Sequence, residues 1–94
     1  MDLSEIETFL TIVNTKSITK TADILFLSQP TVSHRLKSLE KELGFPLFNR
    51  LTRAVSLTPE GERLRDVYLN AFQKIYEEIT QLLQDDFSSL TIYA

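Results

Sequence analysis

The sequence has no cysteine and no tryptophan, and it contains one histidine and two glycines among its 94 residues. Without cysteine, neither disulfide bonds nor thiolate metal sites can form, which fits a reducing cytoplasm. The single histidine, His34, has no cluster of acidic residues around it in the sequence, so no metal site is predicted. No apolar run approaches the ~20 residues of a transmembrane helix, and the acidic start MDLSEIE is unlike a secretory signal. We therefore expect a cytoplasmic protein without a membrane segment.

Patterns that would indicate catalysis are also lacking. Gly44 and Gly61 stand apart and do not form a phosphate-binding loop. Adjacent acids such as Glu77 and Glu78 are predicted to lie on a charged helix face, which is typical of solvation and not of acid–base chemistry. The sequence therefore predicts a protein that is not an enzyme and holds no cofactor.

The charge is distributed unevenly along the chain. The net charge of −3 by itself argues against a nucleic-acid partner. Residues 16–53, however, carry seven basic and three acidic side chains, a local charge of +4, while the segments on either side are acidic. Because salt screens charges beyond ~8 Å, a local basic surface can still bind phosphates.

Two short helices joined by a tight turn are predicted behind a supporting helix. Apolar residues at helical spacing mark the supporting helix at about residues 2–14 and a second helix at about residues 18–26, with Ser17 as its N-cap. A third helix follows Ser28. This order is the helix-turn-helix pattern, which we place at about residues 18–37.

The third helix has an outer face that a purely structural helix would not need. Ser28 is a suitable N-cap, Pro30 fits the first turn, and Gly44 can end the helix in the left-handed backbone conformation. Gln29 lies nearer the buried side, but it can project from the helix end. Opposite the buried stripe, at about 100° per residue, lie Pro30, His34, Lys37 and Lys41, flanked by Thr31 and Ser33. The face is hydrogen-bonding at its N-terminal end and basic further along, which indicates a helix that reads another molecule.

Residues 47–58, the wing segment, are predicted to form a small β-hairpin because apolar residues flank a short polar stretch around Thr52. Arg50 and Arg53 lie on or near its tip. Arg50 could pair with an acidic group or bind phosphate, and the residues leave both roles open. A structural role is harder to find for Arg53.

A long fourth helix is predicted from Pro59 to about residue 87, preceded by Thr58 as a start signal. Its apolar stripe is too long to remain solvated, so a partner helix is expected. The seam of the resulting homodimer is predicted to contain Leu64, Tyr68, Ala71, Phe72, Ile75, Ile79 and Leu82. Residues 88–94 are predicted to begin a β-strand, because LTIYA shows the alternation of side-chain type that is typical of strands. The aromatic side chains are interpreted as core or dimer packing: Phe9, Phe26, Phe45, Phe48, Tyr68, Phe72 and Tyr76.

The run TADILFLSQPTVSHRLKSLEKELGFPLFNRLTRAVSLTPEG resembles the N-terminal DNA-binding segment of LysR-type bacterial transcriptional regulators. Its most specific parts are SQPTVS, the LxxLExxLG ending of the third helix, LFxR and LTPEG. The resemblance implies a mainly α fold: a winged helix-turn-helix over residues 1–58, a dimerising linker helix over 59–87, and from 88–94 the entry to an absent effector-binding domain. Thr21 is a mild departure, because the family usually has a small residue there.

The resemblance also implies roles for individual residues. Gln29, Pro30, Ser33 and His34 would contact base edges in the major groove, and Arg53 would enter the minor groove. Contacts to the DNA backbone are expected from Ser17, Thr19, Lys20, Ser28, Thr31, Lys37 and Arg50. Family members bind DNA as dimers or tetramers, and a small-molecule inducer would act on the absent domain.

Two functions remain open. The first is a sequence-specific DNA-binding module that regulates bacterial transcription. The alternative is a winged-helix protein-interaction module that binds no nucleic acid. The local charge of +4 over residues 16–53 coincides with the predicted helix-turn-helix and wing segment, and it favours double-stranded DNA as the partner.

Overall fold

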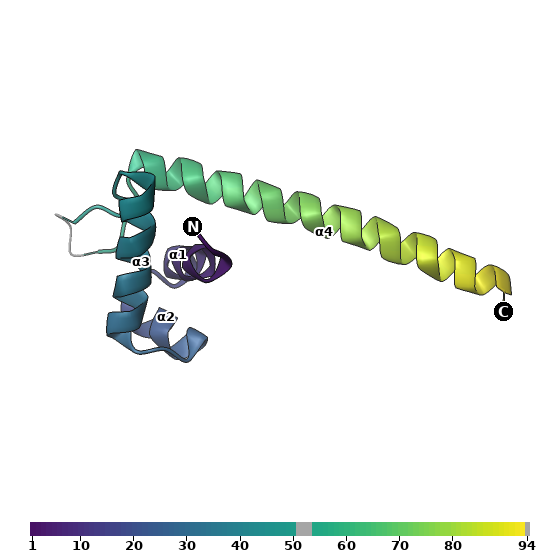
Figure 1. Ribbon diagram of the computed structural model, residues 1–94, viewed down its shortest axis with the longest axis horizontal. Helices are drawn as coiled ribbons and strands as arrows, with labels where there is room; N and C mark the ends of the chain where they lie inside the picture. The colour runs from purple at the N-terminus through teal and green to yellow at the C-terminus, as the bar shows by residue number, and fades with distance from the viewer. Residues whose placement is uncertain (51–53, 94) are drawn as a thin grey trace.

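The computed structural model describes the chain over residues 1–50 and 54–93, with side chains described as far as residue 85. Three short helices form a compact domain, and a fourth leaves it as a long arm (Figure 1). The molecule extends 60 × 27 × 22 Å. The helices within the described residues are α1 (Leu3–Thr15), α2 (Ile18–Leu25), α3 (Gln29–Leu43) and α4 (Pro59–Tyr93).

The predicted start and stop of the third helix are confirmed. The Ser28 hydroxyl accepts a hydrogen bond from the Thr31 N–H at 3.2 Å, which satisfies one of the free donors of the first turn of α3. Gly44 ends the helix in the left-handed conformation, with φ 86°. Ser17 caps α2 in the same way, because its hydroxyl accepts from the Lys20 N–H at 3.0 Å. Local hydrogen bonding therefore fixes both ends of α3.

The core of the domain lies where α1, α3 and the start of α4 meet. Phe9 is fully buried there, with the Phe48 ring 5.6 Å and the Tyr68 ring 6.2 Å from its own ring centre. Leu39 and Leu47 complete this cluster. Because Tyr68 belongs to α4, the long helix is fixed to the domain through its first three turns.

The wing segment is seen only in part. Phe48 and Leu57 form one antiparallel bridge, the Asn49 N–H donates to the Ser56 carbonyl at 2.9 Å, and the Thr58 N–H donates to the Leu47 carbonyl at 3.0 Å. The described residues of this segment contain this bridge and no longer strand, so the predicted β-hairpin is not shown. Thr52 and Arg53, at the predicted tip, lie outside the described residues.

Gly61 lets α4 begin close against the wing segment. A Cβ atom at Gly61 would overlap the Leu47 carbonyl oxygen. The Thr58 hydroxyl accepts from the Gly61 N–H at 3.0 Å and donates to the Pro46 carbonyl at 2.8 Å. The LTPEG sequence therefore combines a helix cap with a close backbone approach, which only glycine permits here.

The long helix continues further than predicted. The strand-like interpretation of residues 88–94 is wrong for residues 88–93, which are helical as far as Tyr93. A lone strand would leave its backbone hydrogen bonds unmade, whereas a helix makes them within its own segment. In the described part of the chain, no helix combines the length and the apolar character needed to cross a bilayer.

Candidate nucleic-acid interface

The N-terminal half of α3 presents its predicted outer face to solvent. Gln29, Pro30, His34 and Lys37 are exposed, while Ser33 is half-buried beside them. Gln29 is the first residue of α3, so its side chain is free of the core although it lies near the buried side of the helix. The opposite side of α3 is anchored by the core, which holds this face in a fixed orientation.

Hydroxyl groups near the starts of α2 and α3 are already engaged in local bonds. The Ser28 and Thr31 hydroxyls lie 2.8 Å apart and share a hydrogen bond. The half-buried Ser17 hydroxyl caps α2, and Thr19 and Lys20 in the first turn of α2 are exposed. These hydroxyls therefore hold the helix starts in place before any ligand is present.

The departure at Thr21 is accommodated by a polar partner. Thr21 is fully buried, and its hydroxyl lies 2.9 Å from the hydroxyl of Thr15. The Thr15 hydroxyl also contacts the Ser17 carbonyl at 3.0 Å. A buried hydroxyl costs little when it is hydrogen-bonded, so Thr21 fits between α1 and α2.

Arg50 has an acidic partner, and this answers part of the question that the sequence left open. Its guanidinium pairs with Glu40 at 3.0 Å, while the second Glu40 oxygen accepts from the Leu47 N–H at 2.6 Å. Glu40 is buried, whereas the Arg50 side chain is 68% exposed. The ion pair therefore joins α3 to the wing segment and leaves most of the guanidinium facing solvent.

Glu40 is not among the residues that the sequence singled out, although it is buried and joins α3 to the wing segment. The signal was available, because Glu40 directly follows Leu39 in the LxxLExxLG ending and lies beside the buried stripe. A shallow groove of about 330 Å³ separates α3 from the wing segment, and its lining includes Ser33, Lys37 and Arg50. The structure thus brings together three predicted DNA-contacting residues that are up to 17 positions apart in the sequence.

Arg53 lies outside the described residues, so its role in the minor groove stays a prediction. In the part of the chain that the structure describes, no three His, Asp or Glu side chains gather as a metal site would require.

The predicted dimer seam divides into two parts. Leu64 is half-buried against the core, and Tyr68 is only 8% exposed. Tyr68 therefore packs inside the protomer, contrary to its predicted place on the seam, because α1 covers this part of α4. Beyond it the stripe is open: Ala71, Phe72, Ile75, Ile79 and Leu82 are all exposed.

Phe26 is a second correction, because it is not a packing residue within the protomer. It ends α2 in the left-handed conformation, with φ 56°, and its N–H donates to the carbonyls of Ala22 and Asp23. The side chain is 94% exposed. Phe26 thus ends α2, and its exposure rules out the core part of the predicted core or dimer packing.

The comparisons agree with this geometry. Residues 3–62 match the family described as "Bacterial regulatory helix-turn-helix protein, lysR family". The chain is 39% identical over 93 residues to the HTH-type transcriptional regulator AbaB of Streptomyces antibioticus, covering 99% of this chain and 31% of that protein. It is 41% identical over 85 residues to the regulator CzcR of Bacillus subtilis (strain 168), covering 90% of this chain and 29% of that protein.

Among solved structures, the DNA-binding domain of BenM in complex with benA site 1 DNA matches with a TM-score of 0.79 and 31% identity, covering 89% of this chain and 94% of that chain. The chain belongs to the LysR family of bacterial helix-turn-helix regulators. It spans less than a third of the length of AbaB and of CzcR.

Proposed function

We propose that this chain is the DNA-binding module of a bacterial transcription regulator and that it binds operator DNA as a homodimer. The observation that carries the proposal is the exposed N-terminal face of α3, with Gln29, Pro30 and His34, on a fold that matches a domain solved in complex with DNA. The major groove, about 12 Å wide, admits an α-helix in this way.

Base reading is assigned to the first two turns of α3. The Gln29 amide can both donate to adenine N7 and accept from its N6 amino group, a bidentate pair that other bases do not offer. His34 and Ser33 add donors and acceptors on the same face, and Pro30 offers an apolar surface to a thymine methyl group. Packing of the opposite side of α3 in the core holds this face in a fixed orientation.

Phosphate binding is assigned to the groove between α3 and the wing segment. Lys37 and Arg50 both line it, and Arg50 is held there by Glu40 at 3.0 Å. An arginine whose position is fixed loses less side-chain entropy when it binds a phosphate. The exposed Thr19 and Lys20 at the start of α2, together with Ser17, Ser28 and Thr31, are proposed as further backbone contacts.

The wing segment is proposed to act as a β-hairpin wing whose Arg53 enters the minor groove. Support comes from the antiparallel bridge between Phe48 and Leu57, which turns the chain back on itself at the base of this segment. A narrow minor groove attracts arginine through its negative potential.

Assembly is assigned to the open part of the α4 stripe, including Phe72, Ile75 and Ile79. An apolar stripe of this length is stabilised when a second helix covers it. A small-molecule inducer and a tetrameric state would belong to a longer regulator that contains this module.

The test begins with selection of tight-binding duplexes from a random library by the wild-type chain. The selected duplex and a scrambled one are then titrated with wild type, Gln29→Ala and Lys37→Ala at one salt concentration. A lost bidentate contact is worth ~1–3 kcal/mol, so Gln29→Ala should lower the ratio of affinities for the selected and scrambled duplexes about tenfold or more. Lys37→Ala should weaken both equally, because phosphates carry no sequence information. Failure to enrich any sequence would favour the protein-interaction module.

A further inference from the structure

His34 is the only histidine of the chain. Histidine is the one type of side chain that ordinarily changes its charge between about pH 5 and 8. His34 is exposed on the outer face of α3, about one turn after Pro30 and about one turn before Lys37. The side chain that can respond to small changes of pH near neutrality therefore lies on the face to which we assign base reading.

Basic side chains predominate around His34. The first turn of α3 contains no acidic residue. Glu40, further along α3, is already paired with Arg50 at 3.0 Å. In the part of the chain that the structure describes, no carboxylate forms an ion pair with His34. A positive charge on this ring therefore has no compensating partner among the charged side chains of the adjoining elements, which are Asp23 on α2, Arg35, Lys37, Glu40 and Lys41 on α3, and Arg50 in the wing segment.

DNA supplies the negative partner that these residues do not. The duplex carries one negative charge for about every 1.7 Å of its axis, and α3 would enter its major groove with His34 on the inserted face. A nearby opposite charge favours the charged form of a titratable group. The DNA-bound state should therefore hold a proton on His34 more tightly than the free protein does.

Protonation also changes which base the ring can recognise. A neutral imidazole has one donor and one acceptor nitrogen, whereas the charged ring donates from both nitrogens. Guanine presents two acceptors, N7 and O6, to the major groove, while adenine presents one acceptor and one donor. Hydrogen bonds from a charged donor are also stronger than neutral ones. Guanine is therefore the base that suits the charged ring best.

We propose that His34 donates to N7 of a guanine in its protonated form, so that binding of operator DNA takes up a proton at this residue. This role rests on the DNA-binding function proposed above, and it adds the base and the protonation state at one position of the reading face. Because the complex holds the proton more tightly, the gain in affinity is complete below the titration range of the free protein. It is lost as the pH rises through the titration range of the complex.

The first test measures affinity as a function of pH. A duplex is selected from a random library at about pH 6 and is then titrated with the wild-type chain between about pH 5.5 and 7.5, where histidine titrates. The affinity should rise about tenfold toward the acidic end, which corresponds to a tenfold tighter hold on one proton. His34→Gln keeps a polar side chain at this exposed position and should show no such rise.

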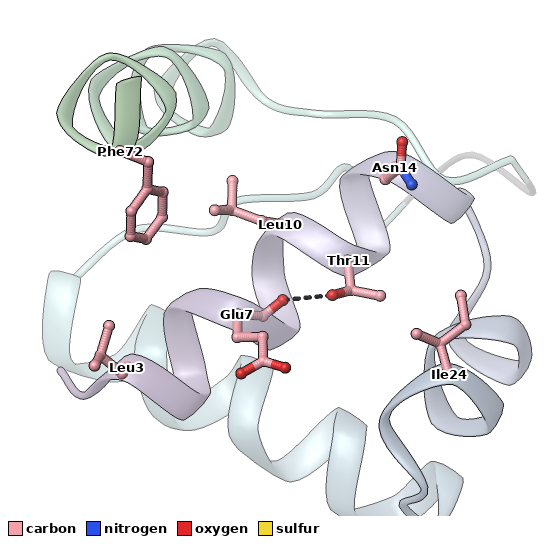
Figure 2. Close-up of a pocket in the computed structure, with 7 residues that line it drawn as sticks. All are labelled: Leu3, Glu7, Leu10, Thr11, Asn14, Ile24 and Phe72. Carbon is pink, nitrogen blue, oxygen red and sulfur yellow. Dashed lines mark hydrogen bonds between the residues drawn. The ribbon is translucent and has the colours of Figure 1, made fainter. Parts of the chain in front are cut away.

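The matched control moves the histidine and leaves the composition unchanged. Gln73 is exposed on α4, directly after Phe72. Figure 2 shows Phe72 beside a groove of about 530 Å³, and the described residues that line this groove include none from α3. His34→Gln/Gln73→His therefore carries its histidine on a helix to which we assign no DNA contact. Its affinity should not depend on pH, and a rise equal to that of the wild type would overturn the proposal.

Modified duplexes test the assigned base. The base 7-deazaguanine pairs with cytosine as guanine does, but it lacks the N7 acceptor. When the guanines of the selected duplex are replaced one at a time, the pH-dependent rise should disappear at one position in each half-site. A rise that persists in every substituted duplex would overturn the assignment of His34 to guanine N7.

The selection separates this inference from the function on which it rests. A library that yields no enriched sequence overturns both the DNA-binding function and the role of His34. An enriched duplex that the wild-type chain binds with the same affinity from about pH 5.5 to 7.5 overturns only the role of His34. Circular dichroism at both ends of this range checks that the wild type and the variants remain folded.

Discussion

The two ends of one apolar stripe on α4 serve different purposes. Tyr68 is 8% exposed and packs on Phe9, whereas Ile75, two turns further along the same stripe, is 53% exposed. Both residues belong to the apolar stripe, but only Tyr68 has α1 beside it. The first part of α4 is therefore core, and the second is the exposed surface that we propose as the dimer seam.

The largest expected effect is the loss of the core contact. Tyr68→Ala should lower the free energy of unfolding by about 3 kcal/mol, the cost of removing a large buried aromatic side chain. Its urea midpoint should fall by a similar amount at low and high protein concentration. Phe72→Ala is the control, and its effect should grow as the protein is concentrated, because it acts through the dimer. If the urea midpoints of both variants depended on protein concentration in the same way, the division of the stripe into a core part and a seam would be contradicted.

Assembly should be lost next. Ile75→Asp should raise the dimer dissociation constant by at least about 100-fold, since each buried side chain is worth ~1.5–3 kcal/mol and the seam contains two copies. Sedimentation equilibrium measures this constant, and circular dichroism checks that the domain remains folded. A wild-type chain that stays monomeric at micromolar concentration would contradict the assignment of the open stripe to a seam.

The ion pair between Glu40 and Arg50 offers a second comparison between a buried and an exposed side chain. Glu40→Ala should cost about 1–3 kcal/mol of stability, because it leaves the buried Leu47 N–H without its acceptor. Arg50→Ala should cost less than about 1 kcal/mol, since its side chain is mostly exposed. Urea titration of the two variants gives the comparison.

Arg50→Ala should have its main effect on the affinity for DNA. If Arg50 neutralises one phosphate, the slope of log affinity against log salt should fall by about one. An unchanged slope would make Arg50 a structural residue only.

The smallest effect concerns the N-terminus, whose ammonium group contacts Glu42. A hydrogen bond to Glu42, aided by the nearby charges of Glu42, Glu5 and Asp2, raises the pKa of the Met1 ammonium above 8.0. The folded state thus holds this proton more tightly than the unfolded state. The resulting stability is present below pH 8 and is lost as the pH rises through the raised pKa.

Thermal unfolding between pH 7 and pH 9.5 should therefore show a slight loss of stability that is absent in Glu42→Gln. This range stops below the ionisation of Tyr68, whose pKa is raised above 10.0 by burial and then by Glu42 and Glu5. A matching loss in Glu42→Gln would assign the pH effect to other groups.

Much of the fold was predictable because its signals are local. Ser28 and Gly44 mark the ends of α3 through hydrogen bonds within a few residues, and Thr58 with Pro59 marks the start of α4. The outer face of α3 follows from helical periodicity alone. The family resemblance rested on motifs of the same region, and the match of residues 3–62 to the lysR family confirmed it.

Burial was less predictable, since it depends on residues distant in sequence. Phe26 looks like core by composition, but the left-handed end of α2 directs it outward. Glu40 looks like a solvated charge, but the returning wing segment buries it and supplies the Leu47 N–H.

The sequence by itself determined where α3 begins and ends and where α4 begins, and it determined that α3 carries a polar outer face and α4 an apolar stripe. Capping bonds and helical periodicity need no distant neighbour, so they can be read from the chain. Only the tertiary structure decided where the core ends along α4, between Tyr68 and Phe72. That boundary is set by the edge of α1, which packs against α4 although it lies more than fifty residues earlier in the chain.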